Sequence, residues 1–303
     1  MKLISGSTRA ILILIALVTF TFTSCEKEQS GSEQEEMEAS QASAESSGEA
    51  ENIFSQVFDD AYGANNEVGL EGSGVFWGRT DSLSPVQRCF TVTVIRLNPP
   101  NAFPVKIILD FGNGCVGPDG HTRRGKIITT YTGRLIHVGS VAETTFDNFF
   151  IDNVKVEGVH RIENITPPAM VALHARKFKV DVINGKLLKP NGNYVHWNSH
   201  KTKTQIDGMA TPFIPHDDAF KIEGQATGTT KRGTLIVAWQ STIVEPLIRR
   251  LSCRWIVRGR IRTVRANTAT TNTSVAILDF GNGVCDNLAT LTINGTTHII
   301  TLP

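Results

Sequence analysis

The stretch "CFTVTVIRLNPPNAFPVKIILDFGNGC", residues 89–115, decides the fold that this sequence predicts. Two alternating runs rich in β-branched residues flank the turn-forming "NPPN", a pattern typical of a β-hairpin. The closing phrase returns at residues 277–285 as "ILDFGNGVC", and each copy follows an earlier cysteine. A catalytic loop and a structural element would both produce such a repeat, so the spacing of the cysteines has to decide between them.

The cysteine spacing favours a structural role for the repeat. In a hairpin, residues equidistant from the turn lie opposite each other, with Cβ atoms about 5 Å apart. The midpoint of Cys89 and Cys115 lies inside the predicted turn "LNPPNAFP", and that of Cys253 and Cys285 inside the polar "ANTATTN". Both pairs are therefore within reach of a disulfide. Of the three possible connectivities, this geometry favours Cys89–Cys115 with Cys253–Cys285, which predicts two disulfide-bonded hairpins, residues 88–115 and 252–285.

Strand-like segments continue to the C-terminus and predict a single all-β domain over residues 64–303. No pair of strands is separated by a helical pattern of 10–15 residues, so parallel crossovers are not expected. The prediction is an antiparallel meander of about a dozen strands. A sheet of that length forms a curled sheet, a barrel or a two-layer sandwich, and the strand pattern does not choose among them. Tight hairpin turns are expected at three Asn-Gly pairs, residues 184–185, 191–192 and 294–295.

One short helix is predicted before the strands, over "NIFSQVFDDAYG" at residues 52–63. Its apolar residues recur at helical spacing, with Asn52 as a possible N-cap and Gly63 as a stop. The apolar stripe is expected to dock on the β-domain, and it consists of Ile53, Phe54, Val57, Phe58 and Ala61.

The N-terminus predicts export and lipidation. Lys2 and Arg9 precede an apolar run that is too short to span a bilayer, so residues 1–24 are expected to be a signal peptide. The "FTSC" before and including Cys25 resembles the lipobox of bacterial lipoproteins, in which the cysteine becomes the lipidated first residue. The alternative is an ordinary cleavage site with a cysteine nearby. Lipidation of Cys25 implies an anchor in the outer membrane or at the cell surface, with the periplasmic face also open.

Residues 25–51 are predicted to form an acidic, disordered tether. Residues 26–51 hold nine Glu, one Lys and no aromatic or β-branched residue, so they cannot bury enough apolar area to offset their ordering entropy. The acidic run is either a surface-export signal or a plain spacer. Residues 52–303 carry 27 basic and 20 acidic residues, a net charge of +7. The sequence thus joins an acidic tail to a basic domain.

Several segments carry a family resemblance: "GKIITTYTGR", "FDNFFIDNVKVEG", "VHWNSHKTKT" and "CDNLATLTINGTTHIITL". With the repeat, they make the chain similar to a family of uncharacterised lipoproteins from Gram-negative, Bacteroidota-type bacteria, over roughly residues 85–303. The resemblance implies the location and an all-β domain. That family has no established activity, so it transfers no functional residue.

The basic segment 249–265 is the main candidate for ligand binding, because it contains seven Arg and no acidic residue. On an extended strand four of these arginines are expected to share one face, which suits phosphate or carboxylate groups. Expected partners are an anionic glycan, a lipid headgroup or lipopolysaccharide. Alternatively, carboxylates on neighbouring strands neutralise this face. The four residues are Arg254, Arg258, Arg260 and Arg262.

Three weaker patterns predict little chemistry. His196 and His200 lie about 13 Å apart along a strand, too far to share a metal ion. The "PHDD" loop, residues 215–218, offers an acid–base pair for a hydrolase. "DFGNGCVGPDG" has oxygen ligands but does not match the EF-hand spacing, and paired cysteines at zinc spacing are absent.

The sequence therefore predicts a non-enzymatic, lipid-anchored envelope protein that binds or organises an anionic component. The first alternative is a carrier that holds a lipid in a cavity of the curled sheet, and the second is a secreted hydrolase. Neither a metal ion, a cofactor nor nucleic acid is expected.

Overall fold

The computed structural model describes residues 31–67, 89–117, 119–211, 214–266 and 274–302. The signal peptide, Cys25 and residues 26–30 lie outside this part. The elements are α1 (Gly31–Glu67), β1 (Thr91–Arg96), β2 (Val105–Asp110), β3 (Cys115–Val116), β4 (Thr122–Tyr131), β5 (Val141–Ile151), β6 (Val154–Asn164), α2 (Pro168–Val171), β7 (Lys177–Leu188), β8 (Tyr194–Asp207), η1 (Pro215–Asp217), β9 (Ala219–Arg232), β10 (Leu235–Arg250), β11 (Ile256–Arg265), β12 (Val275–Asn282), β13 (Leu288–Ile293) and β14 (Thr296–Thr301).

The strands form one antiparallel sheet in chain order, which confirms the predicted meander. The 14 strands run from β1 to β14, and the short β3 pairs only with β4. Within the described residues β1 and β14 do not pair with each other, so the sheet is open. Of the three predicted shapes, the curled sheet is the one found. Strand twist accumulates over so many strands and bends the sheet around whatever fills its concave side.

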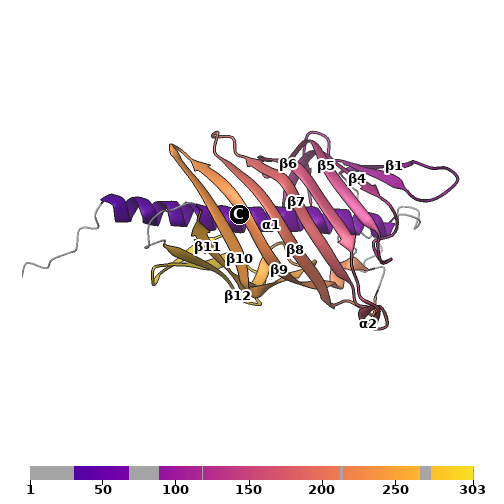
Figure 1. Ribbon diagram of the computed structural model, residues 1–303. Helices are drawn as coiled ribbons and strands as arrows, with labels where there is room; N and C mark the ends of the chain where they lie inside the picture. Colours follow the sequence, from indigo (N-terminus) through magenta and orange to yellow (C-terminus); the bar gives the residue numbers. More distant parts are fainter. Residues whose placement is uncertain (1–30, 68–88, 118, 212–213, 267–273, 303) are drawn as a thin grey trace, which may run out of the picture.

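The concave side is filled by α1, which crosses most of the sheet (Figure 1). The helix has 37 residues, a length of about 55 Å. The prediction of a disordered tether over residues 25–51 is therefore wrong for residues 31–51, which are helical and largely buried from Ala39 onward. The predicted helix 52–63 exists, but it is the central part of a longer helix that continues past Gly63.

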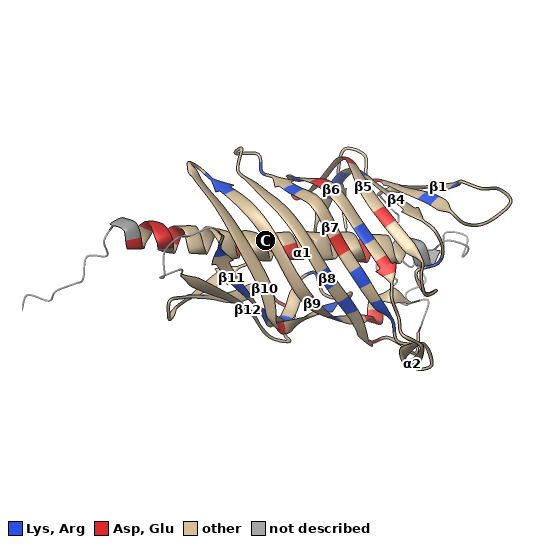
Figure 2. Cartoon of the chain, viewed as in Figure 1, with Lys and Arg blue, Asp and Glu red and all other residues tan. Residues whose placement is uncertain are grey.

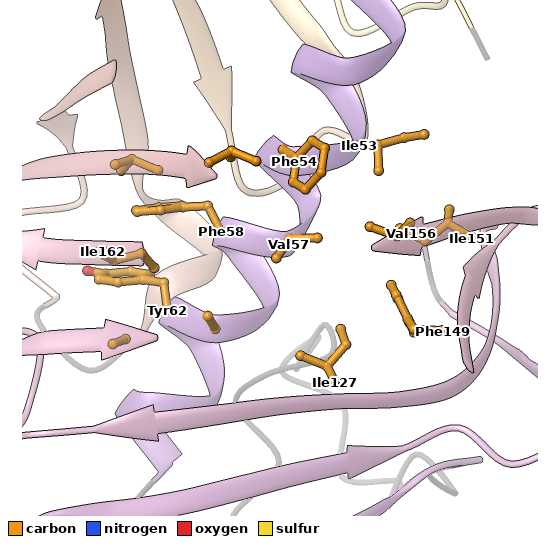
Figure 3. Close-up of a cluster of buried hydrophobic side chains, with 14 of the residues drawn as sticks. Ile53, Phe54, Val57, Phe58, Tyr62, Ile127, Phe149, Ile151, Val156 and Ile162 are labelled. Atoms are coloured by element: carbon orange, nitrogen blue, oxygen red, sulfur yellow. The ribbon is translucent and has the colours of Figure 1, made fainter. Parts of the chain in front are cut away.

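The C-terminal half of α1 is held by the main hydrophobic core. Ile53, Phe54, Val57, Phe58 and Ala61 are all at most 5 % exposed, as the predicted stripe requires. They pack with aromatic and aliphatic side chains from strands β2 to β10, part of which Figure 3 shows. Each fully buried large apolar side chain contributes roughly 1.5–3 kcal/mol, so this half of the helix is firmly anchored.

A row of mostly small side chains across the concave face leaves room for the helix. Residues that pair directly across neighbouring strands point to the same face of a sheet. From β4 to β12 one such row is buried throughout, and only His160 and Val182 in it are larger than threonine. It consists of Thr129, Thr144, His160, Val182, Ser199, Ala226, Ser241, Thr263 and Ala276.

Two of the three Asn-Gly pairs form the predicted hairpin turns, with positive φ at Gly192 between β7 and β8 and at Asn294 and Gly295 between β13 and β14. The prediction was wrong for Asn184-Gly185, which forms a bulge inside β7. A Cβ atom at Gly185 would lie 2.9 Å from Cζ of Phe54, so the glycine allows the helix to approach. Within the described part of the chain, no helix has the length and apolarity to cross a membrane.

Candidate functional site

Both predicted disulfides are present. Cys89 is bonded to Cys115 and Cys253 to Cys285, with Cα atoms 5.3 and 5.8 Å apart. Each disulfide joins the residues before the first strand of a hairpin to those after the second strand. The hairpin symmetry of the sequence therefore gave the correct pairing.

The repeated phrase makes the same hydrogen bond between its aspartate and its first glycine in both copies. Asp110 accepts a hydrogen bond from the backbone N–H of Gly112 through Oδ1, at 2.9 Å, and Asp279 does the same for Gly281. Both glycines have positive φ, which favours glycine. The phenylalanine between them is buried in each copy.

The other carboxylate oxygen of each aspartate faces a cation of the adjacent strand. Oδ2 of Asp110 lies 3.0 Å from Nζ of Lys126, and Oδ2 of Asp279 lies 2.7 Å from Nε of Arg260. The aspartates of the repeat are thus used within the fold. Among the described residues, no group of three or more His, Cys, Asp or Glu is arranged to hold a metal ion.

The interior contains a series of ion pairs between α1 and the sheet, which we call the interior ion pairs. Every acidic member comes from the helix and every basic member from a strand or a strand end (Figure 2). They are Glu36–Arg265, Glu45–Arg232 (2.6 Å), Glu49–Lys189 (2.8 Å), Glu51–Lys201 (2.9 Å), Asp59–Arg249 (2.7 Å) and Asp60–Arg123 (3.4 Å).

These pairs explain why the tether prediction failed. The acidic segment cannot order itself by burying apolar surface, but the basic sheet supplies counter-charges from strands more than 60 residues away in the sequence. The acidic residues of the tail and the basic residues of the domain, whose opposite charges the sequence shows, therefore pair with each other on the concave side of the sheet. Burial of a charge is tolerated when it is paired in this way.

Lys203 is a buried cation with a different environment. Its ammonium group lies 3.4 Å from Oγ of Ser55 and 4.0 Å from the centre of the Phe58 ring. Burial lowers the pKa of Lys203 to about 8, against the raising effect of Asp59 and Glu51 on the helix. The helix therefore stabilises this lysine by charge and by its aromatic face together.

A second polar group lies at one rim of the sheet, and we call it the rim cluster: Gln56, His121, Asp152 and Arg254. His121 precedes β4, Asp152 lies in the turn between β5 and β6, and Arg254 precedes β11. The His121 ring contacts Asp152 through Nδ1, Arg254 at 3.2 Å through the same atom, and Gln56 of α1 at 2.9 Å through Nε2. The cluster thus joins residues next to β4, β5 and β11, which are far apart in the strand order, to the helix.

The contacts of the rim cluster indicate a structural role and not a catalytic one. A histidine oriented by a carboxylate can act as a general base. Here the side chain of His121 is 3 % exposed, and both ring nitrogens already contact protein groups. Burial lowers its pKa, against the raising effect of Asp152. The ring therefore offers no free nitrogen to a substrate.

Next to the rim cluster, two aspartates share one arginine. Arg123 donates two hydrogen bonds to Asp119, at 3.1 and 2.8 Å, while Asp60 of α1 lies 3.4 Å from its Nε. Burial raises the pKa of Asp60 to about 7, with Arg123 lowering it in part. Because Asp119 already neutralises the guanidinium, Asp60 is poorly compensated and takes up a proton near neutral pH. Sequence reasoning missed this group, since its residues are far apart in the chain.

The "PHDD" loop, proposed for a hydrolase, forms η1 and anchors the helix. Oδ2 of Asp218 accepts a hydrogen bond from the hydroxyl of Tyr62 at 2.9 Å, and Oδ1 accepts one from Gln205 at 2.7 Å. Burial raises the pKa of Asp218 to about 7 against these hydrogen bonds and the charge of Arg176. His216 and Asp217 are exposed, so the loop does not assemble the three residues into one site.

The four candidate arginines do not share one face. Arg258, Arg260 and Arg262 alternate with buried residues of β11 and are exposed on its outer face. Arg254 lies before the strand and faces His121. The carboxylate of Glu245 lies 3.5 Å from Arg258 and 3.6 Å from Arg260, as the neutralisation alternative expects. Arg262 has no carboxylate within 4.0 Å among the residues that the structure describes.

His196 and His200 both lie on the outer face of β8 and have different neighbours. His196 packs edge-on against Tyr194, and His200 lies 2.9 Å from Asp181.

Comparison with protein-family models, with curated proteins and with solved structures found no match.

Proposed function

We propose that this chain is a non-enzymatic, lipid-anchored protein of the outer membrane or cell surface that binds an anionic envelope component. The lipobox at Cys25 supports the anchor. His121 in the rim cluster and Asp218 in the "PHDD" loop both contact protein groups, which favours binding over catalysis.

The observation that carries the proposal is the outer face of β11. Three arginines project from it on alternate residues, about 6.5–7 Å apart along the strand. Elsewhere on the sheet both basic and acidic residues occur on the strands (Figure 2), and some cations pair with a carboxylate of the same strand, as in Lys155–Glu157 and Lys221–Glu223. On β11 three cations, Arg258, Arg260 and Arg262, face two carboxylates, Glu245 and Asp279. An anionic group that bridges Arg260 and Arg262 would complete the charge balance.

The test is retention on vesicles that carry lipopolysaccharide and, separately, on a resin that carries an anionic polysaccharide. The protein is used with Cys25→Ser, so that the lipid anchor does not itself bind vesicles. The triple variant Arg258→Ser, Arg260→Ser, Arg262→Ser is expected to lose retention on one of the two supports.

The matched control replaces three partly exposed lysines of other strands by serine: Lys126, Lys155 and Lys221. It loses the same net charge and is expected to keep at least half of the retention. Equal loss in both variants would show a general effect of charge and would reject β11 as the site. Arg254 is left out because it belongs to the rim cluster.

A further inference from the structure

The two halves of α1 differ sharply in what holds them. Residues 53–64 bury aromatic and branched side chains in the main core. Residues 31–51 contain seven Glu, five Ser, four Ala and two Gly, with no basic, aromatic or β-branched residue. Burial of alanine and serine gains little hydrophobic free energy, so the N-terminal half is held by other interactions.

By itself the N-terminal half is a poor helix. Gly48 and the serines have low helix propensity, and Glu45 and Glu49 form a like-charged pair four residues apart. No lysine or arginine within residues 31–51 offsets these charges. The helical state of this half therefore depends on contact with the sheet.

Besides the burial of small side chains, that contact includes four of the interior ion pairs. Arg265, Arg232 and Lys189 have side chains that are 29–38 % exposed, and Lys201 is 4 % exposed. Partly exposed pairs contribute little to stability, because solvent and salt screen them. Apolar packing of a helix would hold this half more tightly than such pairs do, so stability alone does not account for the three partly exposed basic residues, Arg265, Arg232 and Lys189.

Beneath the N-terminal half lies an apolar floor on β12 and β13. Ala44 packs with Ala276, Leu291 and Ile293. A Cβ atom at Gly48 would lie 2.5 Å from Cδ2 of Leu278, so the helix backbone rests directly on this leucine. Displacement of residues 31–51 would uncover this apolar floor and leave four cations of the sheet without their acidic partners: Lys189, Lys201, Arg232 and Arg265.

We propose that the N-terminal half of α1 is the displaceable occupant of a ligand groove, and that the groove takes an anionic amphiphile. The floor suits an acyl chain, and the four cations suit a carboxylate or phosphate head. In the closed state the glutamates of the helix take the place of the head group. This groove is distinct from the outer face of β11, and the evidence for a ligand in the groove does not depend on binding at that face.

The test opens the groove by charge reversal. In the variant Glu45→Lys, Glu49→Lys the helix faces Arg232 and Lys189 with like charges. The control Glu33→Lys, Glu35→Lys makes the same change of charge at two exposed positions of the same half. Binding of 11-(dansylamino)undecanoic acid is measured by fluorescence, with its methyl ester as the uncharged probe.

Affinity for the acid is expected to rise about tenfold or more in the Glu45/Glu49 variant, because the competent fraction of molecules rises. The control variant and the ester are expected to show no such rise. An unchanged affinity, or an equal rise for acid and ester, would overturn the proposal.

Hydrogen exchange on the wild-type protein tests the same idea without a variant. Amides of residues 31–51 are expected to exchange at least about tenfold faster than those of residues 53–64, and dodecanoate is expected to speed them further. Equal protection of both halves with no response to dodecanoate would overturn the proposal as well.

Discussion

Replacement of Glu51 by alanine should cost about 3–5 kcal/mol of the free energy of unfolding, because it leaves a buried charge without its partner. Oε2 of Glu51 lies 2.9 Å from Nζ of Lys201, and both side chains are 4 % exposed. Lys203, also buried, is stabilised in its charged form by the same glutamate. Loss of Glu51 therefore raises the energy of two ammonium groups, which places the cost near the upper end of the range.

The assay is urea unfolding of the disulfide-bonded protein, with the midpoint compared at constant slope. Glu33→Ala, on the exposed start of the same helix, is the matched control and should change the stability by less than about 0.5 kcal/mol. The double variant Glu51→Leu, Lys201→Met removes both charges and should recover most of the loss. If Glu51→Ala and Glu33→Ala had the same effect, the acidic segment would not lie inside the sheet and the reasoning would fail.

Two further predictions concern titration and the disulfides. The folded-state pKa of Asp60, about 7, exceeds its ordinary value of 3.8, so its contribution to stability is complete below pH 3.8 and is lost as the pH rises through 7. The free energy of unfolding should therefore fall from pH 5 to pH 9 by roughly 2–3 kcal/mol more in the wild type than in Asp60→Asn. An equal fall in both proteins would contradict a buried, poorly compensated carboxylate. The variant Cys253→Ser, Cys285→Ser opens a loop with a sequence separation of 32 and should lose roughly 3–4 kcal/mol, measured by thermal or urea unfolding, whereas a loss below about 1 kcal/mol would mean that the hairpin is held by its strand pairing alone.

The strands and the cysteine pairing could be predicted from the sequence because both are local. Alternation with a period of two follows from strand geometry, and a hairpin fixes which residues lie opposite each other. Cys89 and Cys115 obey that symmetry even though a glycine-rich turn lies between β2 and β3. The bulge at Asn184-Gly185 shows the limit, since a positive φ serves a turn and a bulge equally well.

The interior helix could not be predicted because its stability is supplied by distant residues. Composition describes how a segment behaves alone, and residues 31–51 alone have little reason to fold. Their partners lie on strands β7, β8, β9 and β11 and at the ends of those strands. The one available signal was the charge asymmetry, nine glutamates in the tail against a net charge of +7 in the domain. Such a difference predicts attraction between the tail and the domain, but it does not specify which residues of the tail contact which strands.

The interior of the sheet makes curling and helix docking interdependent. An empty concave face would leave Lys201, Lys203 and Arg249 beside apolar side chains with no acidic partner from the helix. The rim cluster has the same dependence, because Gln56 of α1 contacts the His121 that holds Arg254 near β4. The disulfides, in contrast, act within single hairpins and need no helix. The cysteines thus stabilise individual hairpins, whereas the acidic helix stabilises the curvature of the sheet. Withdrawal of part of that helix would therefore change the curvature without breaking the disulfide-bonded hairpins.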